Sequence, residues 1–374
     1  MTDIVPVDDK RVMDGFIRLP WDIYRQDPHW VPPLIVERRQ HLSARNPYFR
    51  HAKARFWIAR RSGRVVGRIS AQVDELYLSR YPDRTGFFGM IEAHDDPEIF
   101  TRLIETASQW LKGQGMTRLR GPFSLSINDE CGLLVAGFDA PPSVMMGHAR
   151  PYYGPQLEAL GLEPVKDLLA YRIRSTVEPT RVMARMMSKV GGRIRVRALR
   201  RRQLKQELEI MRDIFNDAWS ENWGFVPFTR EEFLEMGQTL SLLVDKEFIQ
   251  IAEVDGRPAA MIVLLPNVNE AARDLNGRLL PLGWARLLWR LKVAHPRTGR
   301  IALMGVRKAF QHKILGTALS YRVISEVQRR GVQRGIEEAE MSWVLEDNTR
   351  MRKIIEASGG EAYKRYRIYE KGLD

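Results

Sequence analysis

The sequence lacks the features that place a protein outside the cytoplasm. It contains one cysteine, Cys131, so no disulfide can form within the chain. No apolar run approaches the roughly 20 residues that a membrane-spanning helix needs. Residues 1–6 contain no signal-peptide hydrophobic core. We therefore expect a cytoplasmic protein.

Motifs for metals and nucleic acids are also missing. The 7 histidines and the cysteine show no metal-ligand spacing, so we expect no metal site. No helix-turn-helix or zinc-finger spacing is present. The most basic run, residues 193–205, contains no aromatic side chain on which a base could stack. Nucleic acid is therefore a disfavoured partner.

The composition is that of a folded, basic protein. The 374 residues are 44% hydrophobic and 28% charged, which is typical of globular chains. This length is enough for two domains of about 100 to 200 residues each. A net charge of +13 and a pI near 9.9 favour an anionic partner, such as nucleic acid, an anionic lipid or a phosphate-rich cofactor.

A strand, a basic turn and a helix in succession form the first candidate site. Residues 301–306 predict a buried strand, and apolar residues then recur at helical spacing from Leu315 to about Arg329. The turn between them is basic and ends in Gly316. Backbone N–H groups at a helix N-terminus, with the helix dipole behind them, hold phosphate well. A plain connection with solvated charges is the alternative.

This stretch resembles the coenzyme A pyrophosphate loop of the GNAT acyltransferase superfamily, which has the pattern Gln/Arg-x-x-Gly-x-Gly/Ala. Gln311 matches the first position and Gly316 the last, whereas Ile314 stands where the middle glycine belongs. A side chain at position 314 would narrow the approach of the pyrophosphate. A related protein that senses coenzyme A without turnover therefore stays open as an alternative.

A second motif strengthens the resemblance. Residues 342–348 followed by residues 354–360 resemble the fifth strand of that superfamily, its Asn-headed helix and the glycine before the last strand. An ordinary helix cap is the alternative for the asparagine, and both roles are compatible. The resemblance implies acyl-coenzyme A as co-substrate. The residues that it assigns to the cofactor are Val306, Gln311, His312, Lys313, Gly316, Thr317 and Asn348.

The order of predicted elements indicates an α/β fold, an α+β mixed sheet in two tandem GNAT-like domains. Each half runs strand, turn, strand, strand, helix, strand, short helix, strand. We expect residues 1–175 to form a domain without the coenzyme A loop. A linker at 176–192 and a domain at 193–374 with the acyl-CoA site follow. The corresponding turn of the first half, residues 92–96, carries carboxylates that repel a pyrophosphate.

Transfer of an acyl group to an amine needs a base and a donor to the oxyanion. The resemblance implies backbone N–H groups around Val306 as donors. Glu338 and Glu340 share one face of the strand at 336–344, because strand side chains alternate, and they are the candidate bases. The candidate acids for the leaving thiolate are Tyr363, Tyr366 and Tyr369, with Tyr366 chosen among them. Solvated or salt-bridged carboxylates and a packed tyrosine are the alternatives.

The acceptor site is expected in the first half. A polar loop at residues 126–132 lies between apolar segments, and two adjacent tyrosines follow it. A simple turn is the alternative. The candidate substrate-binding residues are Asn128, Glu130, Tyr152 and Tyr153.

The acyl group and the amine are suggested by two further observations. The chain resembles the long two-unit GNAT-like proteins that include bacterial ceramide synthases, for example in residues 27–33 and 128–132. That resemblance implies transfer of a fatty acyl group to a sphingoid base. Residues 283–293 place tryptophan and leucine on one helical face, opposite arginine and lysine, as in a helix at an anionic membrane surface. The apolar residues of that face are Trp284, Leu287, Leu288 and Leu291. A core-facing helix is the alternative.

Besides a protein that senses coenzyme A without turnover, three functions stay open. The first is a fatty acyl-CoA N-acyltransferase with a lipid amine as acceptor, in peripheral contact with the inner membrane. The second is an acetyltransferase for a small amine or a protein. The third is a basic protein that binds an anionic membrane or nucleic acid without catalysis.

Overall fold

The computed structural model describes residues 2–175 and 191–373, and the chain forms two compact units. Unit 1 comprises Met1–Leu168, Ala272–Leu279 and Lys364–Asp374, and unit 2 comprises Leu169–Ala271 and Leu280–Tyr363. Most of the expected linker, residues 176–190, lies outside the described residues.

These units differ from the expected division at 1–175 and 193–374. The last residues of the chain belong to unit 1, because the end of the final strand pairs with two strands there. Strand pairing joins residues far apart in the sequence, and such pairing leaves no local signal in the sequence of either partner.

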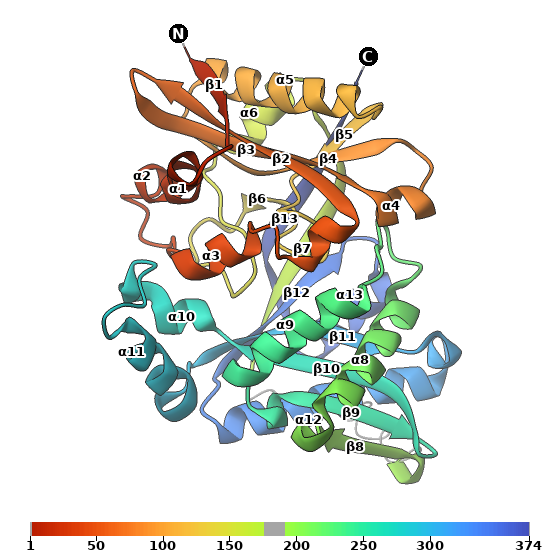
Figure 1. Ribbon diagram of the computed structural model, residues 1–374. Helices are drawn as coiled ribbons and strands as arrows, with labels where there is room; N and C mark the ends of the chain where they lie inside the picture. The colour runs from red at the N-terminus through yellow and green to blue at the C-terminus, as the bar shows by residue number, and fades with distance from the viewer. Residues whose placement is uncertain (1, 176–190, 374) are drawn as a thin grey trace. The chain divides into compact units, whose positions relative to one another are not determined.

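Unit 1 is a mixed sheet in the order β1-β2-β3-β4-β5-β13-β7, with β6 also on β13 (Figure 1). Its strands are β1 (Asp3–Pro6), β2 (Ala52–Arg61), β3 (Arg64–Asp74), β4 (Thr85–Ala93), β5 (Arg118–Gly121), β6 (Leu133–Ala136), the first part of β7 (Glu163–Arg174) and most of β13 (Glu361–Gly372). Its helices are α1 (Lys10–Arg18), α2 (Pro20–Ile23), α3 (Ile35–His41), α4 (Glu75–Arg80), α5 (Pro97–Gly113) and α6 (Tyr153–Ala159).

The long helix of unit 1 follows its sequence signals closely. Asp96 caps α5 by accepting a hydrogen bond from Glu98 N at 2.9 Å, and Pro97 occupies the first helical position. An apolar stripe from Ile99 to Leu111 is buried against β3. Gly67 of β3 lets the helix approach, because a Cβ there would lie 2.7 Å from Ile99.

Unit 2 is a mixed sheet in the order β7-β12-β11-β10-β9-β8. Its strands, besides the end of β7, are β8 (Ile194–Ala198), β9 (Ile249–Val254), β10 (Arg257–Pro266), β11 (Thr298–Val306) and β12 (Glu338–Leu345). Its helices are α8 (Leu204–Trp219), α9 (Arg230–Leu243), α10 (Val268–Ala272, whose last residue belongs to unit 1), α11 (Gly283–Trp289), α12 (Ile314–Gln333) and α13 (Thr349–Ala357).

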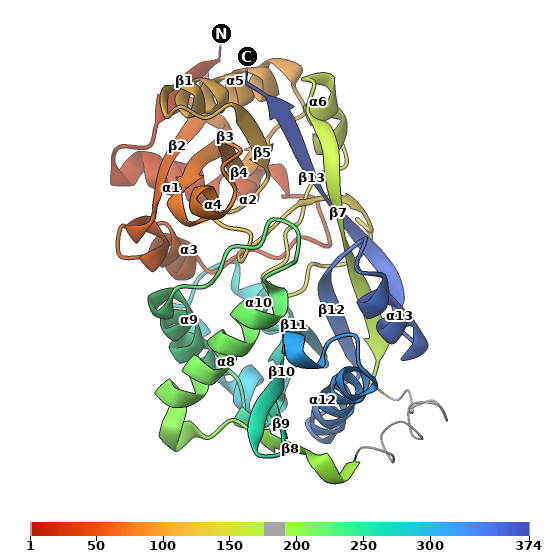
Figure 2. The same cartoon turned by 90° about the vertical axis from the view of Figure 1, so that its right-hand side faces the viewer.

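Helices cover both faces of the unit 2 sheet. Figure 2 shows α8 and α9 on one face and α12 on the other. The hairpin of β9 and β10 turns at Asp255 and Gly256, which both have positive φ, as an Asp-Gly hairpin turn requires. The parallel pair of β11 and β12 is joined through α12, and this crossover positions the candidate site.

Candidate active site

A cavity of about 380 Å³ lies in unit 2 where β11 and β12 separate. Their parallel register ends at Ile301 opposite Met341, and both strands continue beyond it as walls of the cavity. Ala302 is skipped in the ladder between β10 and β11, which makes it a β-bulge. Bulges bend a strand and increase its twist, so this residue accounts for the opening.

The loop after β11 brings the N-terminus of α12 to this cavity. Gly316 lines the cavity, and a Cβ on it would lie 2.1 Å from the carbonyl oxygen of Phe310. Glycine is therefore required where the loop crosses the first turn of the helix. An α-helix leaves its first N–H groups without helical partners, here those of Ile314 and Leu315. Together with the helix dipole, they suit the pyrophosphate of coenzyme A.

The predicted loop side chains divide into two groups. Gln311 holds the loop, because its Nε2 donates to Val306 O at 2.7 Å and to Ala218 O at 3.1 Å. Two basic residues of the turn already have acidic partners: Arg307 with Asp213 and Lys308 with Glu221. In contrast, His312 and Lys313 are exposed, and His312 lines the cavity.

Arg350 is a site residue that the sequence reasoning missed. It lies at the start of α13, lines the cavity, and its Nη2 donates to Thr317 Oγ1 on α12 at 3.1 Å. A guanidinium beside the N-terminus of α12 adds a donor for a phosphate at the same place. Its position two residues after the Asn348 motif was the available signal.

Asn348 has the two roles that its motif allowed. Its side chain caps α13 by accepting a hydrogen bond from Met351 N at 3.1 Å, and it lines the cavity. The cap explains why an asparagine heads this helix, because its oxygen satisfies an otherwise unpaired N–H group.

The backbone N–H group of Val306 is directed toward the cavity side of β11. Arg307 N donates to Ala259 O at 2.9 Å, so Ala260 and Val306 form a non-hydrogen-bonded pair of the antiparallel ladder. The N–H group of Val306 therefore points away from β10, toward the edge from which β12 diverges. This is where a donor to a thioester oxyanion is needed.

Glu340 lies in a buried polar network beside the cavity. Its carboxylate accepts hydrogen bonds from Ser342 and Tyr363, and Arg300 Nε lies 4.0 Å from one carboxylate oxygen. Arg300 Nε also donates to Ser342 Oγ at 2.8 Å, and Ser342 lines the cavity. Glu340 itself does not line it, so Ser342 stands between this carboxylate and the cavity.

Glu338 and Tyr366 have different surroundings. Glu338 is partly exposed and lies 3.6 Å from Arg172, and burial raises the pKa of its carboxyl group. Tyr366 is completely buried and belongs to unit 1, where it pairs with Leu134 of β6. Neither residue lines the cavity of unit 2.

Three tryptophans line the cavity, and the sequence reasoning did not assign them to the site. The rings of Trp219 and Trp343 meet edge to face with centroids 5.5 Å apart, and Trp223 follows α8. Trp219 Nε1 donates to Met304 O at 2.9 Å, which ties α8 to β11. These rings, with methionine and isoleucine side chains from β11, β12 and α13, make much of the wall apolar.

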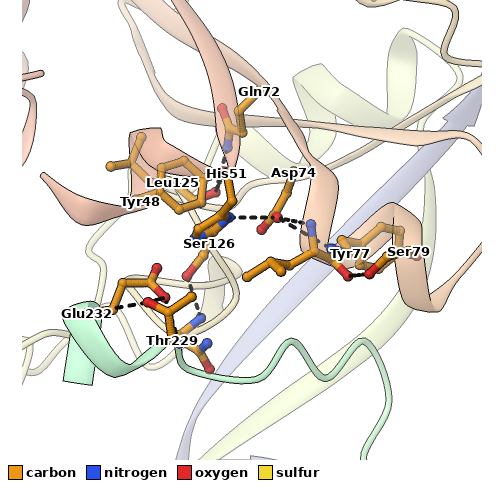
Figure 3. Close-up of polar contacts among 12 residues, drawn as sticks. Tyr48, His51, Gln72, Asp74, Tyr77, Ser79, Leu125, Ser126, Thr229 and Glu232 are labelled. Atoms are coloured by element: carbon orange, nitrogen blue, oxygen red, sulfur yellow. Dashed lines mark hydrogen bonds and ion pairs between the residues drawn. The ribbon is translucent and has the colours of Figure 1, made fainter.

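The polar loop of unit 1 is firmly anchored. The hydroxyl of Tyr48 and the amide of Gln72 both donate to the carbonyl of Leu125 at 3.1 Å, as Figure 3 shows. Glu130 of the loop forms an ion pair with Arg38 of α3, whose Nη1 lies 3.1 Å from Glu130 Oε1. Asn128 N donates to Ser126 Oγ at 3.0 Å. The loop is thus partly buried and hydrogen-bonded, as its sequence suggested.

The hydroxyls of the two tyrosines predicted for the acceptor site donate hydrogen bonds to other residues of unit 1. Tyr152 donates to Ala93 O at 2.8 Å, and Tyr153 donates to Glu92 at 2.6 Å. Tyr24 donates to the same carboxylate oxygen at 2.8 Å, and Arg68 lies 3.6 Å from the other. Burial raises the pKa of both Tyr24 and Tyr153 well above 10.0, so both hydroxyls stay protonated donors.

In unit 1 the corresponding strands, β4 and β5, also separate. The segment that follows β5 occupies the opening between them. The parallel register of β4 and β5 ends at Phe87 opposite Arg120. The segment after β5 then crosses β4, with Phe123 N donating to Phe88 O at 2.8 Å. A Cβ on Gly89 would lie 1.7 Å from Phe123 O. The chain's own residues therefore occupy this opening, and the carboxylate of Asp96 caps α5. The absence of a coenzyme A loop from the first half stays a prediction.

No helix among the described residues is long and apolar enough to cross a membrane. In the same part of the chain, no group of three or more His, Cys, Asp or Glu side chains is arranged to hold a metal ion.

Comparison with known proteins agrees with this geometry. The model of the acetyltransferase (GNAT) family matches residues 208–359. The chain is 47% identical to Protein YghO of Escherichia coli strain K12, over 97% of this chain and 94% of that protein. It is 43% identical to a bacterial ceramide synthase of Caulobacter vibrioides strain NA1000 / CB15N, over 99% of this chain and 97% of that protein.

A solved structure extends the likeness of fold to the whole chain. A tandem GNAT protein from the clavulanic acid biosynthesis pathway aligns with 100% of this chain and 99% of its own, with a TM-score of 0.60 and 13% identity. At this identity the alignment supports the tandem fold alone.

Proposed function

Because the chain belongs to the acetyltransferase (GNAT) family and is an acyl-CoA N-acyltransferase, we propose that its donor is a fatty acyl-CoA and its acceptor the primary amine of a sphingoid base. In this reaction the amine nitrogen forms a bond to the thioester carbon and the C–S bond breaks. The amine loses a proton, the thiolate of coenzyme A gains one, and the product is a ceramide.

The observation that carries the proposal is the likeness to the bacterial ceramide synthase, at 43% identity over 97% of that protein. Because the match spans both units, it includes the acceptor candidates of unit 1 as well as the cavity of unit 2. The apolar wall of that cavity agrees with an acyl donor that carries hydrocarbon.

The donor site that we propose has three parts. The first N–H groups of α12, with Arg350, hold the pyrophosphate. The opening between β11 and β12 takes the pantetheine arm. The N–H group of Val306 donates to the oxyanion that forms at the thioester carbon. His312, Lys313, Thr317 and Asn348 border this site.

We also propose that Glu340 is the base and acts through Ser342. The hydroxyl of Ser342 already donates to Glu340 and lies at the cavity wall. As the amine attacks, its proton passes to Ser342 Oγ while the proton of that hydroxyl passes to Glu340. Tyr363, which contacts the same carboxylate, is better placed than Tyr366 to return a proton to the thiolate.

The test of the substrate class is a transfer assay with two donors. Purified protein is given sphinganine with palmitoyl-CoA or with acetyl-CoA, and the amide product is measured by mass spectrometry. The proposal expects N-palmitoylsphinganine as the main product. Transfer from acetyl-CoA alone, to sphinganine or to small amines, would instead identify an acetyltransferase.

The test of the base compares two glutamates of one strand. Glu340→Gln keeps the shape of the side chain but cannot accept a proton, so kcat should fall about 10²- to 10⁴-fold. The Kd for acyl-CoA, measured by calorimetry, should stay the same. Glu338→Gln is the matched control and should change kcat little. Equal losses in both variants, or a loss only in Glu338→Gln, would remove Glu340 from this role.

A lipid donor and a lipid acceptor both partition into membranes. We therefore place the enzyme in the cytoplasm, in peripheral contact with the inner membrane, as part of the same proposal.

A further inference from the structure

One stretch of unit 2 exposes far more apolar surface than the rest of the described chain. Nine large apolar side chains are exposed among the described residues, and six of them come from Leu280–Val293. We call these six the α11 patch, and their exposed fractions are 80% for Leu280, 72% for Leu282, 50% for Trp284, 41% for Leu288, 58% for Trp289 and 63% for Val293. Soluble proteins rarely gather such side chains at one place without a partner.

The patch is not a poorly packed core helix. Leu287 and Leu291 are the buried side of this segment, at 6% and 3% exposure, and they hold it against unit 2. Trp284 and Leu288 lie one turn apart on the outer side. The sequence predicted all four on one face, whereas the structure separates two that anchor the helix from two that it displays. Figure 1 shows α11 at the margin of unit 2.

The charged residues of the patch segment itself have one sign. Residues 280–297 contain four basic residues and no aspartate or glutamate, and the basic residues are Arg286, Arg290, Lys292 and Arg297. Lys292 is exposed, and burial and the neighbouring Arg201 lower its pKa, whereas Asp245 raises it. Arg297 lies 3.5 Å from Glu337. An anionic surface is thus the complement of this region.

We propose that the α11 patch docks the enzyme on an anionic lipid bilayer. Its tryptophans would lie at the level of the headgroups and its leucines at the boundary of the acyl chains, with the arginines and lysine facing lipid phosphates. A lipid surface suits the segment because exposed tryptophan and leucine lie beside four basic residues, with no acidic residue in the same stretch. The inference rests on the proposed function for its purpose, which is access to lipid substrates at the membrane.

The experiment measures partition onto vesicles by flotation. The protein is mixed with phosphatidylcholine vesicles that contain or lack phosphatidylglycerol. The wild type should bind the anionic vesicles, and the variant Trp284→Gln/Leu288→Gln/Trp289→Gln should bind at least tenfold more weakly. These side chains are exposed, so the variant should unfold like the wild type. Val332→Gln, an exposed apolar residue of α12 outside the patch, is the matched control and should bind normally.

A charge variant and an assay in solution complete the test. Lys292→Glu should weaken the preference for phosphatidylglycerol without changing transfer from palmitoyl-CoA to sphinganine in detergent micelles. Wild-type protein that ignores anionic vesicles, or a triple variant that binds them normally, would overturn the inference. A dimer in solution that the triple variant disperses, without vesicle binding, would assign the patch to a second copy of this chain and would also overturn it.

The two proposals can fail separately. Vesicle binding without any acyl transfer in micelles would retain the docking surface and reject the lipid substrate. Acyl transfer in micelles without vesicle binding would retain the lipid substrate and reject the docking surface.

Discussion

At the scale of single residues, the loop before α12 shows how two similar positions differ. Ile314 replaces the middle glycine of the coenzyme A pattern, and the sequence suggested that its side chain would narrow the site. In the structure it is 70% exposed at the first position of the helix. Gly316 makes the tight crossing, because a Cβ there would meet Phe310 O. The loop therefore needs glycine at position 316, whereas the narrowing of the site by Ile314 stays a prediction.

Arg350 provides the first prediction at this scale. Removing a charged hydrogen bond to a phosphate costs about 1.5 to 3 kcal/mol, so Arg350→Ala should raise the Kd for acyl-CoA by about 10- to 100-fold. Calorimetric titration with palmitoyl-CoA measures this change. Lys353→Ala, at an exposed position of the same helix, should leave the Kd unchanged. Equal affinity in wild type and Arg350→Ala would remove Arg350 from the phosphate site.

Glu92 provides a prediction for pH. Burial raises the pKa of this carboxyl group, so the folded protein keeps a proton that the unfolded chain has lost. The free energy of unfolding therefore has a component that falls as pH rises from the ordinary glutamate pKa of about 4.3 to the raised value. Glu92→Gln removes that component.

The measurement is urea unfolding of wild type and variant at several pH values in this range. The difference between their free energies of unfolding should change in favour of the variant as pH rises. Glu105→Gln, on the exposed side of α5, should show a constant difference. A constant difference for Glu92→Gln as well would contradict the raised pKa.

At the scale of elements, the residues at which helices and strands begin and end follow local sequence signals. The pairing of one element with another does not. Local signals mark three such ends: Asp96 before Pro97 at the start of α5, Asp255-Gly256 at the hairpin, and Asn348 at the cap of α13. Strand β5 is short, Arg118–Gly121. Pro122 cannot donate to a ladder, and Phe123 bonds to Phe88 of β4, so the chain leaves the sheet there.

Helix α12 provides the prediction at this scale, because two of its glycines differ in their surroundings. Gly316→Ala should weaken acyl-CoA binding and lower the free energy of unfolding by about 1 to 3 kcal/mol, because the loop must move from the new methyl group. Gly331→Ala should be neutral or stabilising by up to about 1 kcal/mol. Its nearest neighbour would be an ordinary 3.5 Å away.

Denaturant unfolding and calorimetry on both variants make this comparison. Equal affinity for acyl-CoA and equal free energy of unfolding in the two variants would contradict a close approach of the loop to the helix at Gly316.

At the scale of the whole molecule, the last strand returns to the first unit. Tyr369 to Gly372 pair with β5, and Arg365 to Arg367 pair with β6. Residues 1–175 alone would leave the edges of both strands open, and unpaired edges favour aggregation. The tandem GNAT likeness from the comparisons confirms the expected fold class, while the compact units divide the chain at other residues than the expected domains.

This pairing predicts the behaviour of the isolated first half. Residues 1–175 should show no cooperative thermal transition, whereas the same residues followed by a flexible linker and residues 361–374 should show one. Circular dichroism with heating measures the difference. A cooperative transition in residues 1–175 alone would support the boundary that the sequence suggested.

The sequence by itself determined the loop and helix of the candidate cofactor site, the Asn-headed helix and the mixed α/β class. These are local signals, since caps, turns and hydrophobic periodicity act over a few residues. Tertiary structure alone decided that Glu340 reaches the cavity through Ser342, that Arg350 meets the N-terminus of α12, and that the final strand completes unit 1. Each of these depends on contacts between residues distant in the chain, and such contacts exist only after the sheet has formed.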